Sequence, residues 1–127
     1  MAIVGMGTDI VEIARMQEAL ARSRKLAERV LTANELTLFD ASQYGYRYLA
    51  KRFAAKEAAV KALGSGIGNG ISWQQMEVTN DEWGKPMMAV TGAFAERCHA
   101  LGVTKTHLSL ADEQHYAVAT VILEQGN

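Results

Sequence analysis

A long run of residues without glycine or proline constrains this chain more than any other feature. From about Tyr46 to Leu63 the sequence is dense in alanine and contains no helix-breaking residue, a composition that favours an α-helix. Gly64 follows directly, at a place where a glycine commonly takes the left-handed conformation that ends a helix. The pattern predicts one long helix around which the rest of a small domain has to pack.

Strand patterns flank this predicted helix. The run 3–10 is rich in β-branched residues and predicts a buried strand that ends near Asp9, with a helix following at once. Thr32 and Glu35 have the spacing of a capping box and predict a short helix. Further patterns predict strands over 73–79 and 87–90, a helix over 92–101, and a hairpin formed by 106–111 and 116–123. We expect an α+β fold, with a mostly antiparallel sheet packed against the long central helix.

Composition limits the classes of protein to consider. The 127 residues, 49% of them hydrophobic, fit a single domain over 1–127 but are marginal for enclosing a large active site, so we expect oligomerisation. The single cysteine, Cys98, excludes an internal disulfide and a zinc site with several cysteines. We find neither a signal-peptide pattern nor an uncharged stretch of membrane-spanning length, which predicts a cytoplasmic protein without membrane association. The net charge of -1 gives no overall attraction for nucleic acid.

Two carboxylates each allow a structural and a functional interpretation. Helical projection puts Glu57 on the face of the long helix that should be buried, where a carboxylate needs a cation, hydrogen-bond donors or a metal. An ordinary ion pair with Lys61, one turn further on, is the simplest answer. Asp9 is most simply the N-cap of the first helix. If the two carboxylates met in space, they would form an oxygen-only site suited to Mg²⁺, but their spacing in the sequence leaves this open.

Two longer segments carry a resemblance to a known family. Residues 7–15 (GTDIVEIAR) and 52–66 (RFAAKEAAVKALGSG) together resemble the two signature motifs of bacterial holo-acyl-carrier-protein synthases, which have the 4'-phosphopantetheinyl transferase fold. The likeness extends to 84–86 (GKP), 107–110 (HLSL) and 116–123 (YAVATVIL), so it covers essentially the whole chain. It identifies residues 1–127 as a single phosphopantetheinyl transferase domain.

The resemblance implies a reaction and a catalytic site. Such an enzyme transfers the 4'-phosphopantetheine group of coenzyme A to a serine of apo acyl carrier protein, in fatty acid biosynthesis, and releases adenosine 3',5'-bisphosphate. It implies that Asp9 and Glu57 are ligands of Mg²⁺ and that Lys61 contacts the phosphates or orients Glu57. Glu57 is also our candidate for accepting the proton of the serine hydroxyl.

The resemblance also implies binding residues and an assembly. Arg52 and Lys56 would help to hold the phosphates of the nucleotide, the glycine-rich loop from Gly64 would let the backbone approach the ligand, and Pro86 and His107 would lie near the nucleotide. The implied assembly is a homotrimer with sites between subunits. Because carrier proteins are acidic, we expect the carrier to dock on the basic first helix, through Arg15, Arg22 and Arg24.

Two alternatives remain at this stage. In the first, the chain is a small non-catalytic, oligomeric ligand-binding module, in which Asp9 only caps a helix and Glu57 only pairs with Lys61. In the second, the same metal site hydrolyses the pyrophosphate of coenzyme A with water as the acceptor. The first predicts binding that is independent of metal, and the second predicts turnover without a carrier protein.

Overall fold

The computed structural model describes residues 1–126, which fold into five helices, five strands and a short 3₁₀ segment. In chain order the elements are β1 (Ala2–Glu12), α1 (Ile13–Arg22), α2 (Lys25–Val30), α3 (Ala33–Ala41), α4 (Gly45–Leu63), the 3₁₀ segment Trp73–Gln75, β2 (Met76–Asn80), β3 (Pro86–Val90), α5 (Gly92–Ala100), β4 (Val103–Asp112) and β5 (Tyr116–Gln125). The fold is α+β, as the sequence predicts.

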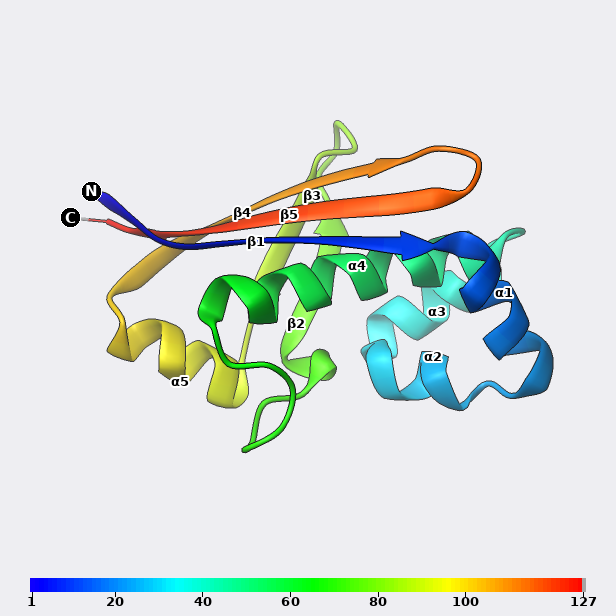
Figure 1. Cartoon of the computed structure of the whole chain (residues 1–127), viewed down its shortest axis with the longest axis horizontal. Helices are drawn as coiled ribbons and strands as arrows, with labels where there is room; N and C mark the ends of the chain where they lie inside the picture. Colours follow the sequence, from blue (N-terminus) through cyan, green and yellow to red (C-terminus); the bar gives the residue numbers. More distant parts are fainter. Residues whose placement is uncertain (127) are drawn as a thin grey trace.

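A three-stranded antiparallel sheet with the order β1-β5-β4 packs on α4, while β2 and β3 form a separate hairpin. Figure 1 shows α4 running along one face of this sheet. Two glycines permit the close approach of β1. A Cβ atom on Gly5 would lie 1.9 Å from the carbonyl oxygen of Ala62, and one on Gly7 would lie 2.1 Å from that of Ala58. Only glycine fits at these positions, because any side chain would collide with the backbone of α4.

The small side chains of α4 form the centre of the core. Five alanines of α4 that pack in this core are 0% exposed, namely Ala50, Ala54, Ala55, Ala58 and Ala59. Alanine has both high helix propensity and little volume, so the same residues make the helix stable and let neighbouring elements come close. The composition of this one helix therefore sets the short distance between helix and sheet.

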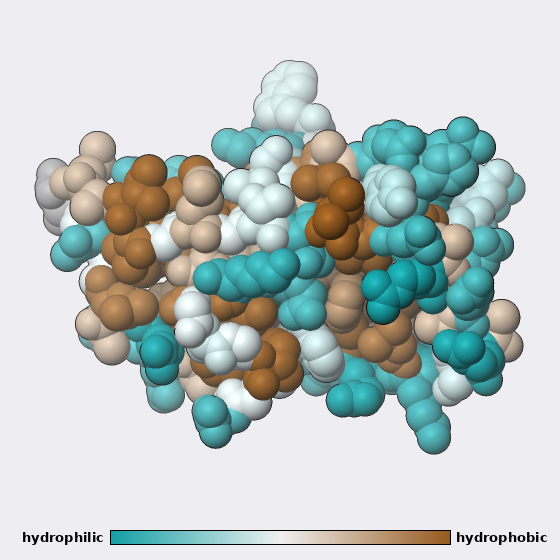
Figure 2. Space-filling model, in the orientation of Figure 1, coloured by the Kyte–Doolittle hydropathy of each residue, from teal (hydrophilic) through white to brown (hydrophobic). Residues whose placement is uncertain are grey.

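The face of the sheet that points away from α4 carries exposed apolar side chains. Met6 and Ile10 of β1 are 65% and 61% exposed, and they pair with Ile122 and Val118 of β5. No described helix covers this face (Figure 1). The space-filling view shows apolar groups along the line of β1, interrupted by hydrophilic ones (Figure 2). An apolar sheet face of this kind is typical of an interaction surface.

Most local predictions are confirmed. The long helix is present as α4, and Gly64 caps it with φ 79°. Thr32 and Glu35 form the predicted capping box at the start of α3. The predicted hairpin of 106–111 and 116–123 exists as the longer pair β4 and β5. None of the described helices is long and apolar enough to cross a membrane.

Two predictions of local structure are wrong, and one helix was not predicted. The first strand is buried on one face only and runs on to Glu12, which is itself the residue that precedes α1. The segment 73–75 is a 3₁₀ turn, and the strand begins at Met76. The basic segment after α1 forms a separate short helix, α2, which the sequence analysis did not anticipate. In each case the observed structure depends on packing between distant segments, which the periodicity of the sequence does not reveal.

Candidate functional site

Asp9 faces α4 from the inner side of β1. Its side chain is 16% exposed, and its Oδ1 accepts a hydrogen bond of 2.9 Å from Nζ of Lys61. The same ammonium donates to the carbonyl oxygen of Thr8 at 3.2 Å. The glycines at 5 and 7 bring β1 against this part of α4, so the contact follows directly from the close helix–sheet packing. The cap interpretation of Asp9 is wrong, because Asp9 lies inside the strand and Glu12 precedes the helix.

Glu57 lies one turn before Lys61 on α4 and is half-buried. No ion pair joins it to Lys61, which binds Asp9 instead, so the ion-pair interpretation is wrong as well. Its Oε2 accepts a long hydrogen bond of 3.4 Å from Nε1 of Trp73. Among residues 1–126 no lysine, arginine or histidine forms a salt bridge with this carboxylate. A half-buried carboxylate without a cation is a candidate ligand for a metal ion.

Trp73 is a member of the site that the sequence analysis missed. Besides its contact with Glu57, its ring packs on Phe53 at a centroid distance of 6.0 Å. The guanidinium of Arg29 lies 5.8 Å from the centre of the same ring. The 3₁₀ turn at 73–75 directs the indole toward α4. The strand predicted for this segment gave no indication that Trp73 would lie beside Glu57. One side of Glu57 is therefore covered by an aromatic side chain.

The donor set around Lys61 fits a magnesium ion. Asp9 and Glu57 supply carboxylate oxygens, which are the ligands that Mg²⁺ prefers, and Mg²⁺ in enzymes is commonly held by one or two carboxylates together with phosphates and water. Groups of three or more acidic, histidine or cysteine side chains suited to a metal do not occur within residues 1–126. Asp9, which binds Lys61, and Glu57, one turn before Lys61 on α4, therefore offer carboxylates for a site that the substrate's own phosphates would complete.

The glycine-rich loop begins where α4 ends. Gly64, Gly66, Gly68 and Gly70 all have positive φ, a conformation that side chains disfavour. Gly64 and Ser65 line a cavity of about 230 Å³, together with Asn69 and Arg97. The loop thus borders a polar space at the end of α4, and the role of Gly64 in ligand binding stays a prediction.

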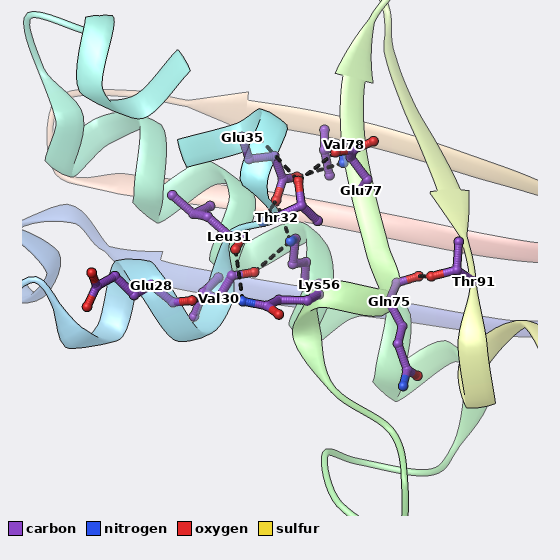
Figure 3. Close-up of polar contacts among 11 residues, drawn as sticks. Glu28, Val30, Leu31, Thr32, Glu35, Lys56, Gln75, Glu77, Val78 and Thr91 are labelled. Atoms are coloured by element: carbon purple, nitrogen blue, oxygen red, sulfur yellow. Dashed lines mark hydrogen bonds and ion pairs between the residues drawn. The ribbon is translucent and has the colours of Figure 1, made fainter. Parts of the chain in front are cut away.

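Lys56 occupies a different environment from the one predicted for it. Its side chain is 0% exposed, and its Nζ donates to Oε1 of Glu35 at 2.6 Å and to the carbonyl oxygen of Val30 at 2.7 Å (Figure 3). Burial lowers the pKa of this ammonium, although Glu35 opposes the shift. The prediction that Lys56 contacts phosphates is wrong, because its ammonium lies in the core and is already bound.

Glu35 is the centre of this buried network. Its Oε1 also accepts from the backbone N–H of Thr32 at 2.9 Å, and its Oε2 accepts from that of Val78 at 2.7 Å. Figure 3 shows that the side chains come from α3, α4 and β2. The capping box indicated Glu35 from the sequence, but nothing local indicated that the same carboxylate is 1% exposed and binds Lys56. The network fixes α4, and with it Glu57, relative to β2.

Arg52, Pro86 and His107 gather in a second region. Arg52 is 5% exposed; its Nη2 donates to Oδ1 of Asn80 at 3.1 Å, while its Nε is buried without a partner among the described residues. Arg52 and Pro86 line a cavity of about 240 Å³, and Pro86 and His107 line one of about 160 Å³. His107 Nε2 lies 2.9 Å from Oε1 of Glu124, and this contact lowers the pKa of Glu124. These three predicted residues therefore share one part of the surface.

A single chain does not bring the two regions together. Arg52 and Lys61 are nine residues apart on α4, which at about 100° per residue puts them on opposite sides of the helix. Asp9 lies on β1 and His107 on β4, which are the two outer strands of the three-stranded sheet. The first region contains Asp9, Glu57, Lys61 and Gly64, and the second contains Arg52, Pro86 and His107.

The three arginines predicted for docking differ in whether an acidic side chain of the described residues already binds them. Arg15 and Arg22 are exposed on α1, and neither forms a salt bridge within the described chain. Arg24 binds Asp40 through two hydrogen bonds of 2.5 and 2.9 Å, and side-chain hydrogen bonding to Asp40 raises the pKa of Arg24. The charge of Arg24 is therefore largely balanced inside the chain.

A cavity of about 510 Å³, larger than the three described above, lies apart from both regions. It is formed where the β4–β5 turn meets the starts of α1 and α4, with Ile13, Tyr46 and His115 in its lining. None of the predicted site residues lines it. Size therefore does not identify the site in this chain, and the chemistry of the side chains is the better guide.

Comparison with known proteins gives consistent results. Residues 5–121 match the model of the 4'-phosphopantetheinyl transferase superfamily. The holo-[acyl-carrier-protein] synthase of Pseudoalteromonas atlantica is 59% identical over 124 residues, which cover 98% of each chain. The crystal structure of such a synthase from Neisseria meningitidis has a TM-score of 0.91 at 36% identity, covering 98% of this chain and 100% of the other. One from Bacillus anthracis, in complex with CoA (3',5'-ADP), has a TM-score of 0.82 at 37% identity, with 98% of both chains covered.

Proposed function

Because this chain belongs to the 4'-phosphopantetheinyl transferase superfamily, we propose that it converts apo acyl carrier protein to its holo form. It transfers the 4'-phosphopantetheine group of coenzyme A to a serine of the carrier and releases adenosine 3',5'-bisphosphate. The observation that carries this conclusion is the full-length similarity to holo-[acyl-carrier-protein] synthases. The set of Asp9, Glu57 and Lys61 supports it with suitable chemistry.

The residues of the first region have distinct roles in this reaction. The serine oxygen attacks the phosphorus next to pantetheine, and the bond from that phosphorus to the bridging oxygen breaks, so that the electron pair leaves with the nucleotide. Glu57 accepts the proton of the serine hydroxyl. Lys61, held beside Asp9 at 2.9 Å, contacts the phosphates. Asp9 and Glu57 are proposed to hold Mg²⁺, which when bound would neutralise the charge of the pyrophosphate.

The proposed active site lies between copies of the chain. Arg52, Pro86 and His107 face a different side from Lys61, so one copy would contribute the carboxylates and another the nucleotide-binding residues. The exposed apolar side chains of β1, such as Met6 and Ile10, supply a surface for this association. We propose a homotrimer, and a single transferase domain formed by residues 1–127 that acts in the cytoplasm in fatty acid biosynthesis.

The carrier protein is proposed to dock on α1. Arg15 and Arg22 are exposed and have no acidic partner within the described residues, so their charge is available to an acidic protein. Arg24 contributes less to docking, because Asp40 already binds its guanidinium.

The test is intact-mass spectrometry of apo acyl carrier protein incubated with this protein, coenzyme A and Mg²⁺. The carrier should gain one phosphopantetheine group, and a chelator should abolish the gain. Glu57→Gln should lower the rate by about 100-fold or more, because it removes a metal ligand and a proton acceptor. Glu96→Gln, an exposed glutamate on α5, is the matched control and should leave the rate unchanged.

Two outcomes would overturn the proposal. Release of adenosine 3',5'-bisphosphate without carrier protein would indicate a coenzyme A pyrophosphate hydrolase. Binding of coenzyme A that is unaffected by chelator, with no transfer to any of a panel of carriers, would indicate a non-catalytic binding module.

A further inference from the structure

The tip of the β2–β3 hairpin carries the most exposed large hydrophobic side chain of the described residues. Trp83 is 87% exposed, whereas tryptophan is ordinarily buried for most of its surface. Figure 1 shows the hairpin extending past β4 on the side of the sheet away from α4. The tip forms the protrusion at the top of Figure 2. A tryptophan in such a position is typical of a residue that packs on something outside its own chain.

The turn that presents Trp83 is held firmly. Oδ1 of Asp81 accepts hydrogen bonds of 2.8 Å from the backbone N–H groups of both Trp83 and Lys85. Nδ2 of Asn80 donates to the carbonyl oxygen of Gly84 at 3.0 Å, and Gly84 has φ 85°. The backbone of the tip is therefore ordered in advance, which lowers the entropic cost of binding a ligand there.

The chain on either side of Trp83 lines the cavity that contains Arg52. Gly84 and Pro86 form one side of this space of about 240 Å³, to which Lys51 and Arg52 contribute two cations. Asp112 also lines it, and its carboxylate pairs with Arg47. Arg52 is 5% exposed and its Nε has no hydrogen-bond partner within residues 1–126. Basic side chains beside a rigid turn suit a phosphate group. An exposed indole next to a cationic pocket therefore has the chemistry of a site for a nucleotide, with a flat base joined to phosphate.

We propose that Trp83 stacks on the adenine of coenzyme A while the cations of the adjacent cavity face its phosphates. The inference rests on the proposed function and adds a residue to it. Trp83 lies on the same hairpin as Pro86, so it belongs to the second region. In the proposed assembly, the second region of one subunit contributes to the active site of a neighbouring subunit. The occupant is the adenosine end of coenzyme A, and packing of Trp83 on a neighbouring subunit is the alternative that the test has to separate.

Binding of adenosine 3',5'-bisphosphate provides the direct test. Adding this nucleotide to the wild-type protein should change the tryptophan fluorescence, and the change should largely disappear in Trp83→Leu. Because stacking of a base on an aromatic side chain contributes about 1–3 kcal/mol, the affinity of Trp83→Leu should fall about tenfold. Trp83→Phe should retain most of the affinity. Inorganic pyrophosphate, which has no base, should bind both proteins equally.

Kinetics give a second, independent readout. Trp83→Leu should raise the KM for coenzyme A about tenfold, since the same stacking energy is lost, while the KM for carrier protein stays constant. Leu38→Ala is the control, because Leu38 is also an exposed apolar side chain, at 54%, but lies on α3. It should change neither KM.

The outcomes separate the inference from the proposed function. If the wild type transfers phosphopantetheine and Trp83→Leu keeps its affinity for the nucleotide, the role of Trp83 is wrong and the transferase stands. If sedimentation shows that Trp83→Leu lowers the mass of the assembly, Trp83 packs on another subunit and the inference is likewise wrong. If the wild type neither binds the nucleotide nor modifies a carrier, both fail.

Discussion

At the scale of single residues, the pair formed by Lys56 and Glu35 shows how this chain separates a structural charge from the carboxylate of Glu57, for which we propose a catalytic role. Lys56 and Glu57 are neighbours on α4, yet the ammonium of Lys56 is buried and paired while the carboxylate of Glu57 is half-buried and has no cation. Adjacent residues on a helix point about 100° apart, so one can anchor the helix while the next serves the site.

Replacing Lys56 tests the anchoring role. Lys56→Met should lower the free energy of unfolding by about 3–5 kcal/mol, because it leaves the carboxylate of Glu35 buried without its cation. The double variant Lys56→Met with Glu35→Gln should recover part of this loss, since a neutral amide replaces the charge. Urea denaturation measures both. Lys25→Met, at an exposed position, is the control; a loss as small as that of the control would show that the pair is not buried.

The contact between His107 and Glu124 makes a prediction about pH. His107 lowers the pKa of Glu124 through a hydrogen bond, so the folded state binds this proton less readily than the unfolded chain does. The contribution to stability is therefore present above the ordinary pKa of Glu124 and is lost as the pH falls through the lowered value. In His107→Ala, an NMR titration of the Glu124 carboxyl should find its pKa higher than in the wild type. An unchanged pKa would assign the shift to another group.

At the scale of elements, the packing of β1 on α4 depends on Gly7. A Cβ atom there would lie 2.1 Å from the carbonyl oxygen of Ala58, so Gly7→Ala should cost about 3 kcal/mol or more and shift Asp9 away from Lys61. Gly66→Ala is the matched control: its Cβ would meet nothing within 4 Å, although φ is +71°, and left-handed backbone alone costs about 1–2 kcal/mol. Urea denaturation of both variants compares the costs, and equal losses would contradict the close approach.

The docking role proposed for α1 predicts a graded response to charge reversal. Arg15→Glu and Arg22→Glu should each raise the KM for apo carrier protein about tenfold at low salt, with a smaller effect at high salt, because surface charges are screened. Arg24→Ala should raise it less, since Asp40 already binds that guanidinium. Lys105→Glu, at an exposed position of β4 outside the proposed docking helix, should have no effect. Equal effects from all four variants would indicate only a change in net charge.

At the scale of the whole molecule, the separation of the two regions predicts complementation between subunits. Glu57→Gln and His107→Ala should each be impaired at low coenzyme A concentration. When the two variants are co-expressed, about a quarter of the shared sites should combine an intact Glu57 with an intact His107, since symmetric assemblies mix their subunits. The mixture should then exceed the mean activity of the separate variants. Activity equal to that mean would show that each site lies within one chain.

The sequence by itself determined those features that depend on neighbours along the chain. Helix propensity and a terminal glycine define α4 and its cap at Gly64, and the spacing of Thr32 and Glu35 defines the start of α3. The two motifs also indicated Asp9, Glu57 and Lys61. The helix, its cap and the capping box are confirmed because backbone preferences act over a few residues, whereas the roles of Asp9, Glu57 and Lys61 stay predictions.

Only the tertiary structure decided how the charges are paired. Lys61 binds Asp9, 52 residues away, instead of Glu57, and Lys56 binds Glu35, 21 residues away. Helical periodicity predicted burial for Glu57. It does not indicate which distant carboxylate or carbonyl group will bind a given lysine ammonium. The separation of Arg52 and His107 from Lys61 also follows from the packing of helix, sheet and hairpin. A partner across space is chosen by the fold as a whole, because burying a charge is favourable only where the assembled elements supply its counterpart.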